Sequence, residues 1–144
     1  FEVGGTVTIS APPTRVWSVL SAPDAWWSHD HRWFKNSTLS LDLAPGGCWC
    51  EQAADGRVSR HLETTLVEPG SKLVLRGGLG PLQGQGATGG LTFDLKAEGE
   101  NSVLTWSYIV GGYTPGGLEA WAGPVDGVLS AQLANLKTRA EAGD

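Results

Sequence analysis

The feature that most constrains the fold is an abrupt change from strand to helix near the start of the chain. Val7 and Ile9 alternate with polar neighbours, which is the period-two pattern of a half-buried strand. Two prolines follow, and proline is tolerated in a helix only in the first turn, where its missing N–H costs nothing. From Pro13 onward, apolar residues recur at helical spacing on one face. The sequence therefore predicts a strand over 1–10 and a helix over 12–21.

The bulk composition indicates one folded domain over residues 1–144. Apolar residues make up 40% of the chain and charged residues 17%, which is typical of a globular protein. The net charge is −5, and the ten lysines and arginines are scattered, so nucleic acid is not an expected partner. No window approaches eighteen consecutive apolar residues, so no membrane span is expected.

The remaining segments predict about six further strands in a meander and then a long amphipathic helix. The strands are recognised by alternating apolar residues, and Asp55-Gly56 is a strong hairpin signal. The final helix is expected to begin or bend at Gly123-Pro124. The expected elements are a helical turn over 23–27, strands over 39–43, 48–53, 57–68, 72–76, 91–95 and 104–110, and a helix over 115–140.

This order of elements, together with the Ala-Pro-Pro-x-x-Val-Trp motif that starts at Ala11, resembles the SRPBCC or START-like superfamily. The resemblance implies an α+β helix-grip fold, in which a curved antiparallel sheet wraps around the C-terminal helix and encloses a ligand cavity. The stretch 39–51 reads Leu-x-Leu-Asp-x-x-x-Gly-Gly-x-Trp-x-Glu and resembles the branch of heat-shock ATPase activator homologues and polyketide cyclases. Small bacterial proteins with a Gly-Gly-Cys-aromatic-Cys-Glu motif and a Gly-Pro-Leu-Gln loop, here at 80–83, are similar as well.

The resemblance also bears on location. Members of this bacterial group often begin with an export signal, and the chain begins at Phe1, without a methionine and inside the first expected strand. A shortened chain and removal of an export signal are both compatible with this start. The resemblance favours an exported, periplasmic location over a cytoplasmic one.

Seven tryptophans in 144 residues are unusually many. Indole rings suit a large apolar pocket as well as a core, because each ring needs a polar partner for its N–H. A helix-grip cavity lined by aromatic rings would bind a small apolar or aromatic molecule, with a few polar groups setting its orientation. The expected lining residues are Trp26, Trp27, Trp33, Trp49, Trp106, Tyr108, Tyr113 and Trp121.

The segment 77–90 is rich in glycine and contains the dinucleotide-type pattern Gly-x-Gly-x-x-Gly at 84–89. That pattern binds pyrophosphate only where a helix N-terminus follows it, and here an alternating strand follows. We therefore expect a flexible loop and no nucleotide or other cofactor. Within it, Leu79 and Leu82 are placed to act as a lid over a cavity.

The hairpin around Asp55-Gly56 brings two cysteines and a histidine together. If these two residues form the loop, Cys50 faces His61 and Cys48 faces Glu63, and all four side chains share one face. Three interpretations are open: a zinc site, a disulfide within Cys-x-Cys, or two buried thiols beside a histidine. Positions i and i+2 of a strand lie about 6.5–7 Å apart, which is wide for zinc-bound sulfurs and for a disulfide. The pattern thus favours free thiols and no metal.

The two acid–base candidates are Glu51 and His31, which lie near tryptophans in the sequence. Glu51 alternates with Trp49 and should be drawn toward the interior, where a carboxylate must be paired or have a raised pKa. Its expected cross-strand partner is Arg60, so a structural ion pair is the alternative to an acid–base role. His31 follows Asp30, which could orient its imidazole for proton transfer, although a solvated loop explains the same residues.

The sequence therefore predicts a helix-grip protein that binds a small hydrophobic or aromatic ligand. One alternative is a cofactor-independent enzyme of the cyclase or dehydratase type, with Glu51 or His31 as the base. A second alternative is a co-chaperone-like module, which would need a contiguous exposed apolar patch in place of a cavity.

Overall fold

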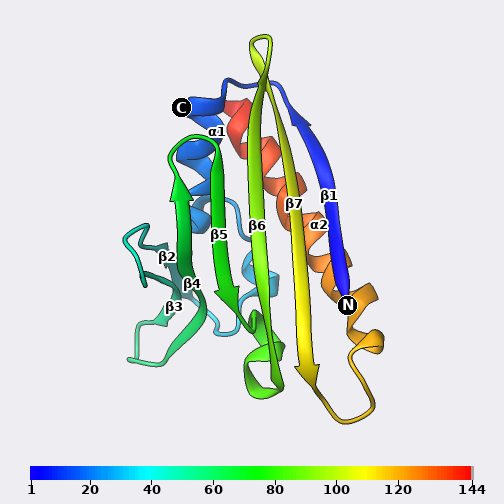
Figure 1. Cartoon of the computed structure of the whole chain (residues 1–144). Helices are drawn as coiled ribbons and strands as arrows, with labels where there is room; N and C mark the ends of the chain where they lie inside the picture. The colour runs from blue at the N-terminus through cyan, green and yellow to red at the C-terminus, as the bar shows by residue number, and fades with distance from the viewer. Residues whose placement is uncertain (144) are drawn as a thin grey trace.

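The strand-to-helix change expected after Ile9 is present in the computed structural model, which describes residues 1–143 (Figure 1). Helix α1 spans Pro13–Leu20 and has a proline in its first turn, as predicted. The other elements also follow the predicted order. They are β1 Glu2–Ile9, the 3₁₀ turns η1 Pro23–Ala25 and η2 His29–His31, β2 Ser37–Leu41, β3 Cys48–Ala53, β4 Val58–Glu68, β5 Lys72–Gly77, η3 Gly80–Gly84, β6 Gly86–Glu98, β7 Asn101–Tyr113 and α2 Glu119–Ala142.

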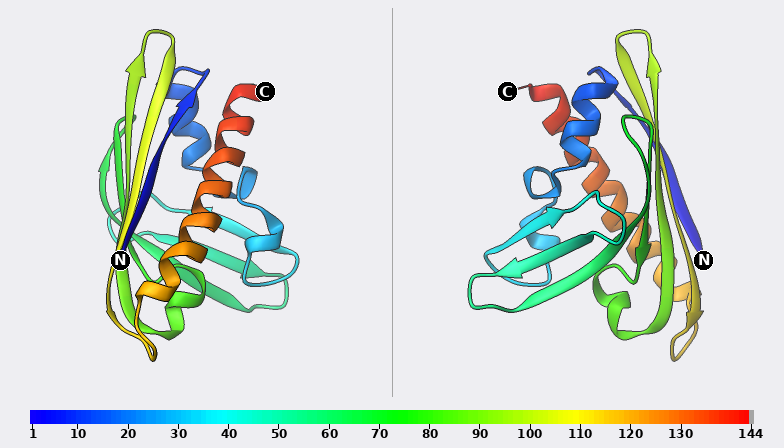
Figure 2. Two further views of the ribbon diagram at one scale, coloured as in Figure 1. Left: turned by 90° about the vertical axis from the view of Figure 1, so that its right-hand side faces the viewer. Right: turned by 60° about the vertical axis from the view of Figure 1, so that its left-hand side comes forward.

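The seven strands form one antiparallel sheet in the order β1-β7-β6-β5-β4-β3-β2. Strands β2 to β7 are a meander, and β1 joins its far edge beside β7. The sheet curls so strongly that the β2–β4 end turns across the front of helix α2 (Figure 2). The α+β helix-grip fold predicted from the sequence is therefore confirmed.

The core lies between the concave face of the sheet and the helices. Strand β7 shows the simplest pattern, because every second residue from Ser102 to Val110 is buried. The C-terminal half of α2 covers this face with Leu129, Leu133 and Leu136, each of which is almost fully buried. Among the described residues, no helix is long and apolar enough to cross a membrane.

Helix α1 packs against the C-terminal end of α2 and closes that end of the molecule. The guanidinium group of Arg15 donates hydrogen bonds to the backbone oxygens of Arg139, Ala140 and Gly143. The first two carbonyls belong to the last turn of α2 and the third to its C-cap residue, where no intrahelical N–H donors remain for them. Arg15 thus ties the end of α2 to α1.

Of the element boundaries that differ from the sequence-based expectation, the starts of α2 and β6 differ most, while β2 begins two residues earlier and β7 is longer than expected. Helix α2 begins at Glu119 and not at residue 115, because Gly116 and Gly117 adopt φ angles of +87° and +90°, which a helix cannot include. Strand β6 begins at Gly86, so residues 86–90 of the expected glycine-rich loop are strand, and η3 occupies its middle. At Gly89, a Cβ atom would lie 2.6 Å from the ring of Tyr108, so glycine lets the two strands pair there.

Candidate ligand-binding site

A cavity of about 310 Å³ lies between the concave face of the sheet and the N-terminal half of α2. Its wall is mostly apolar and aromatic, with a few polar side chains. The lining residues come from the loop after η1, from β2–β4, from η3, from β7 and from α2. They are Trp27, His31, Arg32, Trp33, Leu39, Trp49, Glu51, His61, Leu79, Gly80, Pro81, Leu82, Tyr108, Trp121, Pro124, Val125, Val128 and Leu129.

The expected aromatic lining is present in part. Trp27, Trp49 and Tyr108 line the buried wall of the cavity, and Trp121 contributes from α2. Trp33 also lines it and is 52% exposed.

Three expected lining residues lie elsewhere. Trp26 packs behind the wall, 6.0 Å from Trp49 between ring centroids, and its indole N–H donates to the backbone oxygen of Val19. Trp106 is buried on the concave face but is not part of the cavity wall. Its ring fills the space left by Gly5 of β1, which carries no side chain. Tyr113 is the last residue of β7 and is 72% exposed, because the strand extends beyond the sheet's covered region.

Glu51 is the polar centre of the site. Its side chain is 1% exposed, and its carboxylate accepts four hydrogen bonds of 2.7–2.9 Å. The donors are the backbone N–H groups of Trp33 and Phe34, the Ser37 hydroxyl and Nε2 of His61. Burial alone would raise the pKa of this carboxyl, but the four hydrogen bonds outweigh it and hold the pKa below its ordinary value of 4.5.

This arrangement changes the expected role of Glu51. A carboxylate with a lowered pKa is a weak base, and its four lone-pair positions are already occupied. The expected ion pair with Arg60 is absent, because Arg60 instead lies 3.3 Å from Glu63 on the outer face of the sheet. Glu51 therefore anchors the aromatic loop to β3, and its geometry does not favour proton transfer.

A β-bulge explains why His61, and not Arg60, meets Glu51. Cys48 pairs with Glu63 as predicted, but the register shifts by one residue after Trp49, so that Cys50 pairs with Arg60. His61 is the extra residue on β4, and its side chain turns toward the cavity. The predicted pairing of Cys50 with His61 is wrong.

The difference from the predicted register begins at the hairpin loop. The Ala53 N–H donates to the Arg57 oxygen, so the loop has three residues, 54–56, and not the predicted two. Gly56 has a φ of +93°, the left-handed conformation that three-residue loops require at this position.

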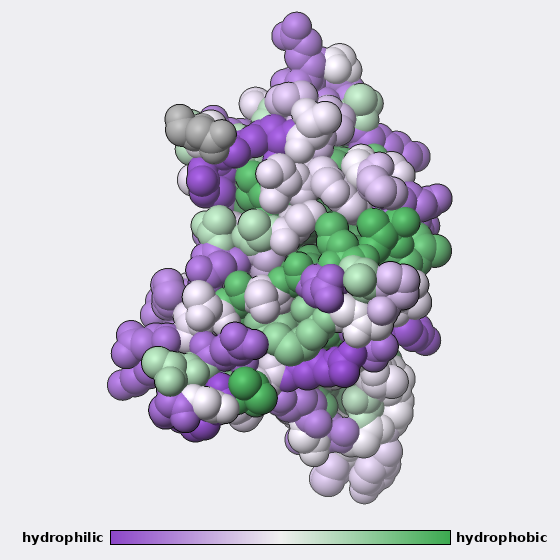
Figure 3. Space-filling model, turned by 90° about the vertical axis from the view of Figure 1, so that its left-hand side faces the viewer, coloured by the Kyte–Doolittle hydropathy of each residue, from purple (hydrophilic) through white to green (hydrophobic). Residues whose placement is uncertain are grey.

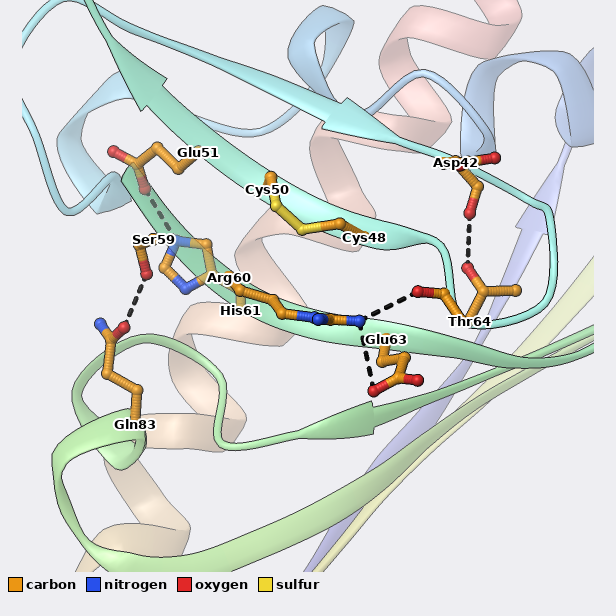
Figure 4. Close-up of a disulfide and its surroundings, with 11 residues drawn as sticks. Asp42, Cys48, Cys50, Glu51, Ser59, Arg60, His61, Glu63, Thr64 and Gln83 are labelled. Atoms are coloured by element: carbon orange, nitrogen blue, oxygen red, sulfur yellow. Dashed lines mark hydrogen bonds and ion pairs between the residues drawn. A yellow bond between two sulfur atoms is a disulfide. The ribbon is translucent and has the colours of Figure 1, made fainter. Parts of the chain in front are cut away.

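The cysteines lie on the opposite, convex face and form a disulfide, so the favoured interpretation of two free thiols is corrected (Figure 4). The Cα atoms of Cys48 and Cys50 are 5.3 Å apart, within the range for a disulfide. The register shift lies between Trp49 and Cys50, and the Cα separation is shorter than the about 6.5–7 Å between positions i and i+2 of a straight strand. The weak zinc candidates Cys48, Cys50 and His61 are thereby separated onto two faces of the sheet. Among residues 1–143, no group of three or more metal-ligating side chains is assembled.

The segment 77–84 covers the cavity, and two buried side chains hold it in place. Nδ1 of His61 accepts a hydrogen bond from the Gly80 N–H at 3.2 Å. The Tyr108 hydroxyl accepts from the Leu79 N–H at 3.0 Å and donates to the Gly77 oxygen at 2.7 Å. Burial raises the pKa of Tyr108. Leu79 lines the cavity from this segment, as expected for a lid residue.

His31 lies at the cavity on the other side, held by Gln132 of α2. The Gln132 side-chain oxygen accepts from the Ser28 N–H at 2.7 Å, so its nitrogen faces Nδ1 of His31 at 2.9 Å. Since Nδ1 accepts this hydrogen bond, the proton of the neutral ring is on Nε2.

Arg32 is the most buried cation at the site, with a side chain that is 1% exposed. Its terminal nitrogens donate to both a carboxylate and a backbone oxygen of Asp24, and to the backbone oxygens of Trp27 and Ser37. Its Nε–H is buried and has no hydrogen-bond partner among the described residues.

Sequence reasoning considered His61 only as a weak zinc candidate and did not place it at the cavity, and it missed Arg32 and Gln132 as site residues. The length of the loop around Gly56 was a usable signal for His61. A three-residue loop would have shifted the predicted pairing of β3 with β4 by one residue and placed His61 on the other face of the sheet. Arg32 stands between Trp27 and Trp33 in the printed sequence, yet its burial depends on contacts that no local pattern encodes.

Comparison with known proteins agrees with this geometry. The model of the family described as "Polyketide cyclase / dehydrase and lipid transport" matches residues 1–141. The chain therefore belongs to this family, which is of the SRPBCC type, as its sequence motifs indicated. No curated relative matches the chain.

Solved structures share the fold at low sequence identity. Protein MLL2253 from Mesorhizobium loti has a TM-score of 0.67 and 19% identity, covering 100% of this chain and 99% of that one. DynU16, from the dynemicin biosynthetic locus, has a TM-score of 0.69 and 21% identity, covering 99% of this chain and 48% of that one. CalU16 from Micromonospora echinospora has a TM-score of 0.64 and 18% identity, covering 96% and 75%.

Proposed function

We propose that this protein binds one small aromatic molecule in the cavity between the sheet and α2. The observation that carries this proposal is the wall itself, in which four tryptophans and several aliphatic residues surround about 310 Å³. Small-molecule sites have volumes of about 300–1,000 Å³ and are mostly apolar. A cavity of about 150 Å³ holds benzene, so this one matches a two-ring molecule better than a long lipid chain.

The polar groups of the wall further define the ligand. Glu51, His61 and Tyr108 have their acceptor positions engaged within the protein. Among the polar groups that remain are two donors: Nε–H of Arg32, and Nε2–H of His31 in the tautomer that its contacts impose. A ligand that carries a hydrogen-bond acceptor, such as a carbonyl oxygen, would satisfy them.

The proposal is tested by titrating the protein with two-ring aromatic compounds and following tryptophan fluorescence. We expect saturable quenching, because Trp27, Trp33, Trp49 and Trp121 line the cavity. A ketone such as 2-acetylnaphthalene should bind more tightly than naphthalene. The absence of saturable quenching with any two-ring compound would contradict the proposed role.

A cyclase-like activity is the second candidate, supported by the family and by the location of DynU16 in a biosynthetic locus. The same donors would stabilise an enolate oxygen formed from a bound carbonyl compound. This role needs a base, and Glu51 is a poor one for the reasons given above. Conversion of a ketone-bearing two-ring substrate, followed by chromatography, distinguishes catalysis from binding alone.

The co-chaperone-like alternative has less support. The large exposed hydrophobic residues are dispersed, since Val58 and Leu66 lie on β4 while Ile109 lies on β7, which is separated from β4 by β5 and β6. Hydrophobic side chains do gather across the middle of one side of the molecule (Figure 3). A protein partner that binds equally well when the cavity is filled would support this alternative.

A further inference from the structure

The convex face of the sheet carries a second chemical centre, separate from the cavity. Cys48 and Cys50 are both partly exposed there, while Trp49 between them points to the cavity side. We propose that this disulfide is a thiol–disulfide exchange site, and that the hollow beside it receives a small thiol that carries carboxylate groups.

The immediate neighbours of the disulfide are charged. Arg60 is the cross-strand partner of Cys50, and Glu63 is the partner of Cys48, so both side chains share the face of the sulfurs (Figure 4). The Arg60 guanidinium lies 3.3 Å from the Glu63 carboxylate and donates to the Gly46 oxygen at 2.9 Å. By pairing with Glu63, Arg60 offsets the repulsion between that carboxylate and a cysteine thiolate that leaves the disulfide.

Next to this group is a polar hollow of about 240 Å³, lined by both Arg60 and Arg76. Arg76 is exposed on β5 opposite Glu63, and it has no ion pair or hydrogen bond among the described residues. The three charged groups carry a net charge of +1, and Arg60 already neutralises Glu63. Arg76 is therefore available to an anionic group.

The separation fits a small peptide-like thiol. Arg76 and Cys48 lie two strands apart in the sheet, with Glu63 between them. Two strand spacings are about 10 Å, which the Arg76 side chain and a ligand with a carboxylate one or two residues from its thiol can span together. A tripeptide thiol such as glutathione could place its sulfur at the disulfide and a carboxylate at Arg76.

The reaction consumes two thiols and transfers two electrons. The thiolate of the first attacks one cysteine sulfur, the protein S–S bond breaks, and the other cysteine leaves as a thiolate and takes up a proton. The second thiolate attacks the small-molecule sulfur of this mixed disulfide and releases the first cysteine. The protein is reduced to the dithiol, and the two small thiols are oxidised to their disulfide.

The test compares reduction of the oxidised protein by glutathione and by the neutral thiol 2-mercaptoethanol. Samples are quenched with acid, alkylated and analysed by mass spectrometry, and each rate is divided by that for an unstructured Cys-x-Cys peptide. We expect a higher normalised rate with glutathione. Arg76→Gln should lower this rate about two- to fivefold, the size of one exposed ion pair, with no change for 2-mercaptoethanol.

Lys72→Gln is the matched control, because it removes an equal charge from the same strand, from a lysine that pairs with Asp94. It should leave both rates unchanged. The wild-type comparison also stands without any variant, and added salt should reduce the preference for glutathione. A disulfide that resists millimolar glutathione, or equal normalised rates for the two thiols, would overturn the proposal.

Discussion

The two ends of the layer between sheet and α2 are built from the same elements but packed differently. At the closed end, Ile9, Leu104 and Leu136 are fully buried, and α1 seals them from above. At the other end, rigid rings such as Trp49 and Tyr108 surround the cavity, and hydrogen bonds hold the covering segments in place. Aliphatic side chains can interdigitate and fill space, whereas large rings whose surroundings are fixed cannot collapse inward.

This difference has an energetic consequence. Empty volume costs stability, at about 24 cal/mol per Å³ in measured core cavities. The wall of this cavity lacks packing contacts that the closed end makes, so the closed end and the polar anchors around Glu51 supply more of the stability. Stability and ligand binding should thus depend on different residues, and the following variants test that division.

The largest expected effect is on stability at the closed end. Leu136→Ala should lower the free energy of unfolding by about 2–5 kcal/mol, because it removes a fully buried side chain. Urea denaturation measures this loss. Leu66→Ala, at a residue that is 42% exposed, should cost much less. Ligand affinity of the folded Leu136→Ala protein should match that of the wild type, and a large loss of affinity would contradict the division between the two ends.

Glu51→Gln should be the next most damaging change. The amide presents donors where the carboxylate accepted four hydrogen bonds, so at least one buried donor loses its acceptor. We expect a loss of about 2–3 kcal/mol in the free energy of unfolding. The matched control is Glu63→Gln on the convex face, whose side chain is 53% exposed. Equal effects of the two variants would show that Glu51 is not an anchor.

The same carboxyl should make stability depend on pH. Its native pKa lies below the ordinary value of 4.5, so its contribution is fully present above that pH and is lost as pH falls through the native pKa. The wild-type free energy of unfolding should therefore decrease on acidification below about pH 4.5, and Glu51→Gln should show a shallower decrease. Asp24 has a lowered pKa as well, mainly through the hydrogen bond from the Leu39 N–H, so some slope should remain.

Trp121→Ala should affect binding more than stability. Trp121 lines the cavity from α2 and is only partly buried, so its removal leaves the closed end intact. We expect about tenfold weaker binding of 2-acetylnaphthalene by calorimetry, from the lost aromatic contact. Tyr113→Ala, outside the cavity, is the control. Trp49→Ala is a less clean test, because that ring also packs against Trp26.

The smallest effect is expected at His31. His31→Phe keeps a ring at the cavity but removes the Nε2–H donor, so it should weaken binding of the ketone about fivefold, the value of one hydrogen bond. Binding of naphthalene should hardly change. His29→Phe serves as the control, because His29 is exposed and is not a lining residue. Equal losses for both ligands would indicate a steric effect instead.

The fold could be predicted because each element has a local signal, from the alternation in β7 to the prolines that begin α1. The apolar character of Trp49 also correctly drew Glu51 inward. The partner of Glu51 could not be predicted, because it depends on one extra residue at a bulge. Likewise, the anchoring of the Gly80 segment by His61 joins parts of the chain that have no common sequence pattern.

The bulge at His61 links two features of the β3–β4 hairpin, the position of the imidazole and the disulfide. One additional residue on β4 sends the imidazole to the cavity, and the same register shift lies between Cys48 and Cys50, which meet on the other side. In a regular hairpin, a transplanted Cys-x-Cys pair would have its sulfurs too far apart. Deletion of one residue from β4 would turn the side chains between that position and the hairpin loop to the opposite face of the sheet. In engineering terms, the binding pocket and the sulfur chemistry of this protein would have to be moved together.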